Sequence, residues 1–136
     1  MQLFLAAEEL IIKKKILLWF SKTQPSEHQL RLLKVHFGKS LVVTMDLRAL
    51  VTADDIVKTF QEGGYHEIAI SGLKRNLVVI AKFLSLNIHP LWINLQEVSE
   101  EEDADMVEEQ PDGNKVLYRF VGFNRVLALD PLLKDL

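Results

Sequence analysis

Short apolar runs alternate along this chain with longer segments in which apolar positions recur at helical spacing. The apolar runs predict buried strands over residues 16–20, 41–45, 67–71 and 88–95. The helically spaced segments between them predict helices over residues 26–37, 52–62 and 73–86. The chain therefore begins with three strand and helix pairs, followed by a fourth strand.

Residues at the ends of these helices agree with the predicted boundaries. The first helix begins at Ser26. Thr52 has the character of an N-cap, and Asp54 and Asp55 follow it in the first turn, where acidic side chains favour the positive end of the helix dipole. Gly38 follows the first helix, and glycine is the residue that most readily adopts the left-handed conformation of a helix end. Local chemistry and apolar spacing thus predict the same elements.

This order of elements predicts the fold class. Strands that lack a polar face and are joined by helices form a parallel sheet covered on both sides, because right-handed crossovers place successive strands next to each other. We expect a small Rossmann-like α/β domain with three layers and about four strands. The 136 residues, 49% of them hydrophobic, suffice for one core, so residues 1–136 form a single domain with residues 1–14 as an N-terminal extension.

The C-terminal part has a different pattern. Residues 97–112 include nine acidic side chains and no Lys or Arg, and a turn-forming cluster follows at residues 111–114. This composition predicts a solvated acidic loop over residues 97–114. Apolar runs at 115–121 and 124–130 then predict either an antiparallel hairpin or one long bent strand at the sheet edge.

Charge is unevenly distributed along the chain. The 16 basic and 19 acidic residues give a formal charge of −3, which argues against a polyanionic partner. Outside the acidic run, however, 16 basic and 10 acidic residues remain, a formal charge of +6. The predicted folded body is therefore basic and able to attract an anionic ligand, and the acidic loop could screen or guard the site.

The chain lacks the residues that several classes of function require. The chain has no cysteine, which excludes disulfides and thiolate chemistry, and its four histidines are scattered, so no metal site and no cofactor are predicted. Neither GxGxxG nor a P-loop motif is present. No apolar run is long enough to span a membrane, and basic residues follow the first apolar run instead of preceding it, unlike a signal peptide. We expect a cytoplasmic protein with no membrane and no duplex nucleic acid as partner.

A candidate ligand site lies at the carboxyl ends of the predicted strands, where open parallel sheets bind ligands. Glycine allows close approach of a ligand, and the free amides of a following helix attract anions. The site residues expected there are Ser21, Lys22, Thr23, Asp46, Arg48, Ser71, Gly72, Lys74, Arg75 and Asn76.

Two features of this site have structural alternatives. Lys74 and Arg75 are unfavourable at the positive end of a helix dipole, by up to about 1 kcal/mol, unless an anion binds there or the side chains extend into solvent. Asp46 contributes a catalytic or ribose-binding carboxylate, pairs with Arg48, or caps the turn.

The third predicted helix is apolar on more than one side. One stripe contains Ile80, and a second contains Phe83. A helix that is apolar nearly all round is buried on two sides, which in a small domain indicates a subunit interface. We expect a twofold homodimer.

Four segments together resemble a known group of proteins. These are ILLWF, the following SKTQPSEHQLRLLKVHFG, the stretch EIAISGLKRNLVVIAKFLSLNIHPLWINLQEV and the closing VLYRFVGFNRVLAL. They are similar to the small CRISPR-associated Rossmann-like proteins related to CARF domains, a group that includes ring nucleases. The resemblance extends over residues 16–129.

The resemblance implies a function. A homodimer would hold a cyclic oligoadenylate over the strand ends, and a ribose 2′-hydroxyl would attack the adjacent phosphate without a metal, giving a 2′,3′-cyclic phosphate. Lys22, Lys74, Arg75 and the amides near Gly72 would position the ribose and stabilise the charge. No catalytic residue is carried over, because this chain has Ser71-Gly72 and Lys74-Arg75 where many relatives have an apolar-proline segment before the third helix. The alternative is a non-enzymatic interaction module that uses the dimer face and the acidic loop.

Overall fold

A computed structural model describes residues 15–45 and 52–134 of the chain. Its elements, in order, are β1 (Ile16–Phe20), α2 (Glu27–Phe37), β2 (Val42–Met45), α3 (Ala53–Glu62), β3 (Glu67–Ser71), a 3-10 turn (Lys74–Asn76), α4 (Leu77–Ser85), β4 (Leu91–Val98), a second 3-10 turn (Glu101–Asp103), β5 (Met106–Glu109), β6 (Lys115–Arg125) and α5 (Asp130–Lys134).

The strands form one mixed sheet of six strands in the order β2-β1-β3-β4-β6-β5. The first four strands pair in parallel, whereas β6 is antiparallel to both β4 and β5. The predicted α/β class is therefore confirmed. The sheet is larger than expected, because the C-terminal part contributes two antiparallel strands.

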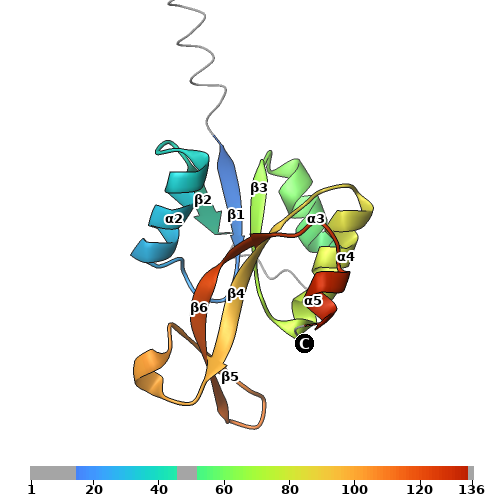
Figure 1. The fold of residues 1–136 in the computed structure, drawn as a ribbon. Helices are drawn as coiled ribbons and strands as arrows, with labels where there is room; N and C mark the ends of the chain where they lie inside the picture. The colour runs from blue at the N-terminus through green and yellow to red at the C-terminus, as the bar shows by residue number, and fades with distance from the viewer. Residues whose placement is uncertain (1–14, 46–51, 135–136) are drawn as a thin grey trace, which may run out of the picture.

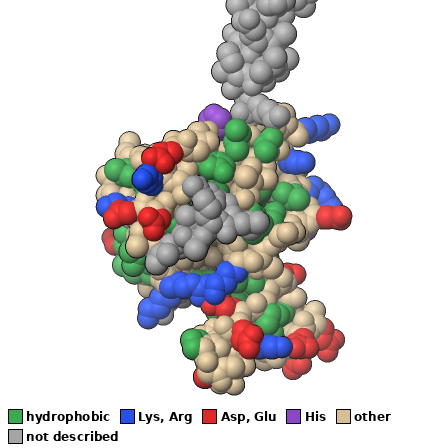
Figure 2. Space-filling view, turned by 180° about the vertical axis from the view of Figure 1, so that it is seen from behind, with side chains coloured by type: hydrophobic (Ala, Val, Ile, Leu, Met, Phe, Trp, Pro, Cys, Tyr) green, Lys and Arg blue, Asp and Glu red, His purple; other side chains and the backbone are tan. Residues whose placement is uncertain are grey.

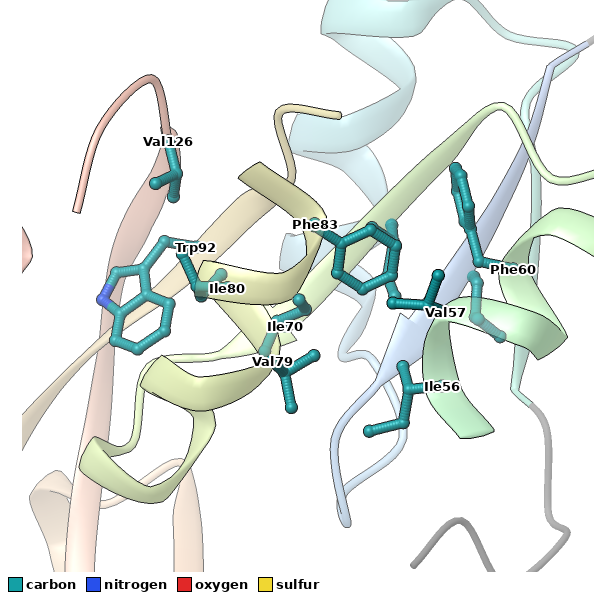
Figure 3. Packing of buried hydrophobic residues seen from close by; sticks show 11 residues of the cluster. Ile56, Val57, Phe60, Ile70, Val79, Ile80, Phe83, Trp92 and Val126 are labelled. Atoms are coloured by element: carbon teal, nitrogen blue, oxygen red, sulfur yellow. The ribbon is translucent and has the colours of Figure 1, made fainter. Parts of the chain in front are cut away.

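Helices cover both faces of the parallel strands. α2 lies on one face and α3 and α4 lie on the other, as Figure 1 shows. The core is correspondingly divided into two clusters. Leu17, Trp19 and Leu33 belong to the cluster on the α2 face. Phe83 of α4 and Phe60 of α3 belong to the cluster on the opposite face, where their rings meet edge to face at 5.4 Å (Figure 3).

The predicted helix start at Ser26 and the predicted N-cap Thr52 each form a complete capping box. The Ser26 hydroxyl accepts a hydrogen bond from the Gln29 amide at 3.1 Å, and the Gln29 side chain accepts one from the Ser26 amide at 2.9 Å. Thr52 and Asp55 form the same reciprocal pair at the start of α3. Each box satisfies backbone donors that a helix start otherwise leaves unpaired. The predicted starts of both helices are confirmed.

The C-terminal half departs from the prediction in two ways. The acidic run is not a solvated loop, because it forms the end of β4, a 3-10 turn and strand β5, in which Met106 and Glu108 are buried. β6 is one long strand, as one of the two alternatives predicted, but it lies between β4 and β5 and not at the sheet edge. Both differences have one cause, since the charge content of a segment does not reveal the pairing that a distant strand provides.

The antiparallel part of the sheet projects beyond the helices. We call residues 95–120, which hold the second half of β4, the second 3-10 turn, β5 and the first half of β6, the arm. Figure 1 shows the arm extending below the region covered by helices. A register shift between Asn94 and Leu95 marks the place where the arm begins. A bulge of this kind bends a strand and increases its twist.

Other predicted boundaries shift slightly. A 3-10 turn at Lys74–Asn76 precedes α4, which starts at Leu77 and not at residue 73. β4 starts at Leu91, directly after Pro90, which has no amide to donate to a ladder. Trp19 and Trp92 are core residues. The proposed N-terminal extension lies outside the described residues, and among the residues described no helix is long and apolar enough to cross a membrane.

We expect Phe83→Ala to lower the free energy of unfolding by about 3–5 kcal/mol, because Phe83 is fully buried and the truncation leaves a cavity. Urea denaturation followed by circular dichroism measures the change. Ser85→Ala on the same helix is the control, since Ser85 is exposed and should change stability by about 0.5 kcal/mol or less. Equal losses in the two variants would contradict the described orientation of α4.

Candidate functional site

The direction of chain progression reverses at the centre of the parallel strands. From β1 the chain passes through α2 to β2 on one side, and it later returns to β3 on the other side of β1. The carboxyl ends of β1 and β3 therefore flank a topological switch point. Open α/β sheets bind ligands outside the strand ends at such a point.

A cleft lies at this switch point, between the strand ends and the arm. It has a volume of about 500 Å³, and its walls are Lys22, Arg75, Glu108, Glu109, Gln110 and Pro111. Lys22 follows β1, Arg75 follows β3, and the other four residues come from the arm. Figure 2 shows basic side chains gathered where the arm meets the rest of the molecule, with acidic side chains on the arm below. We call this cavity the switch-point cleft.

Arg75 and Glu108 form the main ion pair of the cleft. Both terminal nitrogens of the Arg75 guanidinium donate to the two Glu108 carboxylate oxygens, with 3.1 Å between Nη2 and Oε2. This fork geometry is among the strongest hydrogen-bonding arrangements in proteins. The Glu108 side chain is only 7% exposed, whereas that of Arg75 is 47% exposed. The buried partner of the pair therefore comes from the arm.

The pKa of Glu108 reflects this environment. The hydrogen bond from Arg75 lowers the pKa of the carboxyl, burial opposes that shift, and the positive charges of Arg75 and Lys22 lower it further. Glu108 also acts on Tyr118 of β6, where burial first and the charges of Glu108 and Glu97 second raise the pKa of the phenol. The cleft is thus lined by two acidic side chains, Glu108 and Glu109, and by two basic ones, Lys22 and Arg75.

Two of the basic side chains predicted for the site remain available to contact a ligand. Neither Lys22 nor Lys74 forms an ion pair with another residue in the described part of the chain. Lys22 lines the switch-point cleft, but Lys74 does not. The structure therefore brings Lys22 and Arg75 together in one cavity.

The other predicted site residues make local structural contacts. The Trp19 indole donates to the Thr23 carbonyl at 2.8 Å, and the Thr23 amide donates to the Ser21 hydroxyl at 3.4 Å. Asn76 is buried, and its amide nitrogen donates to both the carbonyl (2.8 Å) and the hydroxyl (2.9 Å) of Ser71. These bonds hold the turns after β1 and β3 that carry Lys22 and Arg75.

Gly72 approaches a strand closely. Its amide donates to the Ile93 carbonyl of β4 at 2.8 Å, which extends the pairing of β3 with β4. A Cβ at this position would collide with that carbonyl. The neighbouring strand β4 therefore occupies space that a side chain at residue 72 would fill.

Asp46 and Arg48 lie outside the described residues. Sequence reasoning missed Glu108, because the surrounding acidic residues indicated solvent and nothing local marks the one that is buried. The alternation of Met106, Val107, Glu108 and Glu109 was the available signal, since a strand with Met106 inside also places Glu108 inside. Within the described residues no group of His, Cys, Asp and Glu could hold a metal ion.

We expect Arg75→Ala to cost about 1–3 kcal/mol of stability at pH 7, because Glu108 would stay buried without its charged partner. Arg75 holds the folded-state pKa of Glu108 below its ordinary value of 4.5, so this stabilisation is present above that pH. It is lost as the pH falls through the lowered pKa. Urea denaturation between pH 7 and pH ~3 should show the difference between wild type and variant shrinking with acidification.

Arg119→Ala is the matched control, since Arg119 is an exposed arginine of β6 that donates to the neutral Gln96 side chain at 2.7 Å. Its effect should be small at every pH. A pH-independent difference between Arg75→Ala and wild type would contradict the role assigned to the ion pair.

Comparison with known proteins adds no assignment: no family model, no curated protein and no solved structure matches this chain. The functional argument therefore depends on the residues and geometry of the chain itself.

Proposed function

We propose that this protein is a small Rossmann-like domain that binds a phosphate-bearing nucleotide in the switch-point cleft, with a cyclic oligoadenylate as the first ligand to test. One observation carries the proposal. Lys22 and Arg75 follow the two strands that flank the switch point, and both line the same cavity of about 500 Å³. Two cations converging at that position suit an anionic group.

The ion pair supports a phosphate ligand in particular. Arg75 presents both of its terminal nitrogens to the two oxygens of Glu108. Phosphate oxygens accept the same bidentate pair of hydrogen bonds from arginine. In this proposal Glu108 is an internal competitor, and a ligand phosphate replaces it on Arg75 while Lys22 provides a second positive charge.

Binding is the core of the proposal, and cleavage is its extension. Metal-independent attack of a ribose hydroxyl on a phosphate requires charge stabilisation, to which Lys22 and Arg75 are suited. A general base would accelerate it, yet Glu108 is poorly suited to that task, because its pKa is lowered and Arg75 occupies both its oxygens. Product analysis accordingly tests turnover separately from binding.

The proposed assembly is a homodimer through α4. Much of the apolar surface of this helix is used within the chain, since Val79, Ile80 and Phe83 are buried. Val78 and Leu86 of the same region remain exposed. These two residues support the proposed subunit contact.

A second candidate function is protein interaction through the arm. β5 pairs only with β6 among the described strands, which leaves its outer edge open, and Val107 on this strand is 51% exposed. An open edge strand can pair with an extended segment of another protein. This candidate requires no nucleotide binding.

We expect isothermal titration calorimetry with cyclic tetra-adenylate or cyclic hexa-adenylate to show binding that Lys22→Ala weakens about tenfold, because a charge-assisted contact is lost. Lys58→Ala on α3 is the control, since Lys58 is exposed and does not line the cleft. Glu108→Gln should strengthen binding, because it removes the competing negative charge. Chromatography of the mixtures detects any linear or 2′,3′-cyclic phosphate product.

The absence of binding for both rings would refute the proposal for cyclic oligoadenylates. Equal weakening by Lys22→Ala and Lys58→Ala would show that the ligand does not occupy the switch-point cleft. Binding without product would assign a receptor and not a nuclease.

We expect light scattering to give a dimer mass at micromolar concentration and a monomer mass for Val78→Asp, because an unpaired charge is costly in an apolar interface. Val35→Asp on α2 is the control, since Val35 is 81% exposed on a different helix. A monomeric wild type would remove the dimer from the proposal.

A further inference from the structure

A second cavity lies on the α4 face of the sheet, where β4 and β6 meet the segment that leads into α5. Its volume is about 420 Å³, within the range of small-molecule sites. Its walls include Gly72, Trp92, Asn94, Asn124, Leu127 and Leu132. None of the charged residues of the switch-point cleft lines this cavity. We call it the Trp92 pocket.

Trp92 presents an unused hydrogen-bond donor to this pocket. Trp92 as a whole is 6% exposed, and its Nε1 donates to no residue in the described part of the chain, but this nitrogen is not fully enclosed by protein atoms and opens onto the pocket. Figure 3 shows the indole nitrogen on the side of the ring that faces away from Ile80 and the core. By contrast, the Nε1 of Trp19 donates to the Thr23 carbonyl at 2.8 Å. The Trp92 N–H is thus accessible from the pocket and available to an acceptor atom of a ligand.

Gly72 keeps the space beside this donor open. A Cβ at residue 72 would lie 2.9 Å from Trp92 Nε1 and 3.0 Å from the adjoining ring carbon. Any larger side chain would therefore crowd the indole nitrogen. Gly72, expected from the sequence to permit close approach of a ligand, provides that room on the α4 face.

Two amide side chains add polar groups of both kinds. The Asn94 Nδ2 donates to the Asn124 Oδ1 across the β4–β6 pair over a long 3.4 Å. The side-chain carbonyl oxygen of Asn94 and the side-chain NH₂ of Asn124 have no partner in the described part of the chain. The pocket thus offers one acceptor and further donors close to the indole N–H.

The pocket is nevertheless electrically neutral. Arg125 is the one charged residue on its wall, and its guanidinium donates to both carboxylate oxygens of Glu67, at 3.0 and 2.9 Å. It also donates to the His89 carbonyl at 2.8 Å. Because this charge is compensated, an anionic ligand gains little here. The apolar side chains of Leu127 and Leu132 instead favour an uncharged ring.

We propose that the Trp92 pocket binds a neutral, planar heteroaromatic ring whose in-plane acceptor receives the hydrogen bond of the Trp92 indole. The asparagine pair hydrogen-bonds the remaining polar edge of the ring, and the leucines contact its faces. This site is independent of the switch-point cleft, since it uses different side chains and requires no phosphate.

Titration of the ¹⁵N-labelled full chain with adenine and with nicotinamide, followed by heteronuclear NMR, tests the proposal. The two indole N–H signals are assigned with Trp19→Phe. We expect the Trp92 signal to shift saturably with a Kd below about 1 mM and the Trp19 signal to stay in place. Toluene, a ring without an acceptor, should bind at least about fivefold more weakly, because the indole donor would remain unpaired.

The double variant Asn94→Ala, Asn124→Ala should weaken adenine binding about fivefold or more, since the ring loses the hydrogen bonds from both asparagine side chains. Gln96→Ala is the matched control, because Gln96 lies two residues further along β4, outside the pocket lining. No saturable shift of the Trp92 signal with either ring, or equal shifts of both indole signals, would overturn the proposal. Because neither probe carries phosphate, failure here leaves the switch-point proposal intact, and failure there leaves this one intact.

Discussion

The pairing of β6 with β4 is the interaction on which the other features of this molecule depend. It aligns eight residues of β4, from Leu91 to Val98, with the C-terminal strand. This pairing covers the edge that β4 would otherwise expose. It also brings Phe120 and Phe123 onto the α2 face and leads the chain to Val126 in the opposite cluster. One long antiparallel ladder thus contributes to both halves of the core.

The same pairing creates both candidate sites. β5 follows the outer side of β6, and so Glu108 reaches Arg75 at the end of β3. Further along the ladder, Asn124 lies opposite Trp92, and the two help to line the Trp92 pocket. The parallel strands alone would supply the cations and the indole. The antiparallel strands supply the carboxylate, the asparagine and the walls that enclose them.

Charge in this chain has a structural role that its distribution in sequence conceals. The nine acidic residues of the run at 97–112 suggest solvent exposure when taken together. One of them, Glu108, is buried against Arg75, whereas Glu109 beside it is exposed. The difference arises because successive side chains of a strand point to opposite faces. The acidic segment therefore neutralises part of the basic strand ends and also forms a wall of the cleft.

The sequence alone determined the elements whose stability is local. Apolar runs, the capping boxes at Ser26 and Thr52 and the order of strands and helices depend on residues close together in the chain. Only the tertiary structure decided the position of β6, the burial of Glu108 and the free donor of Trp92. These depend on partners far away in the chain, as with Arg75 and Glu108, which are 33 residues apart, or with Leu91 and Arg125, which pair across β4 and β6. Strand pairing over such separations leaves no local periodicity, and that is why the fold class and the cations Lys22 and Arg75 were predictable whereas Glu108 and the Trp92 pocket were not.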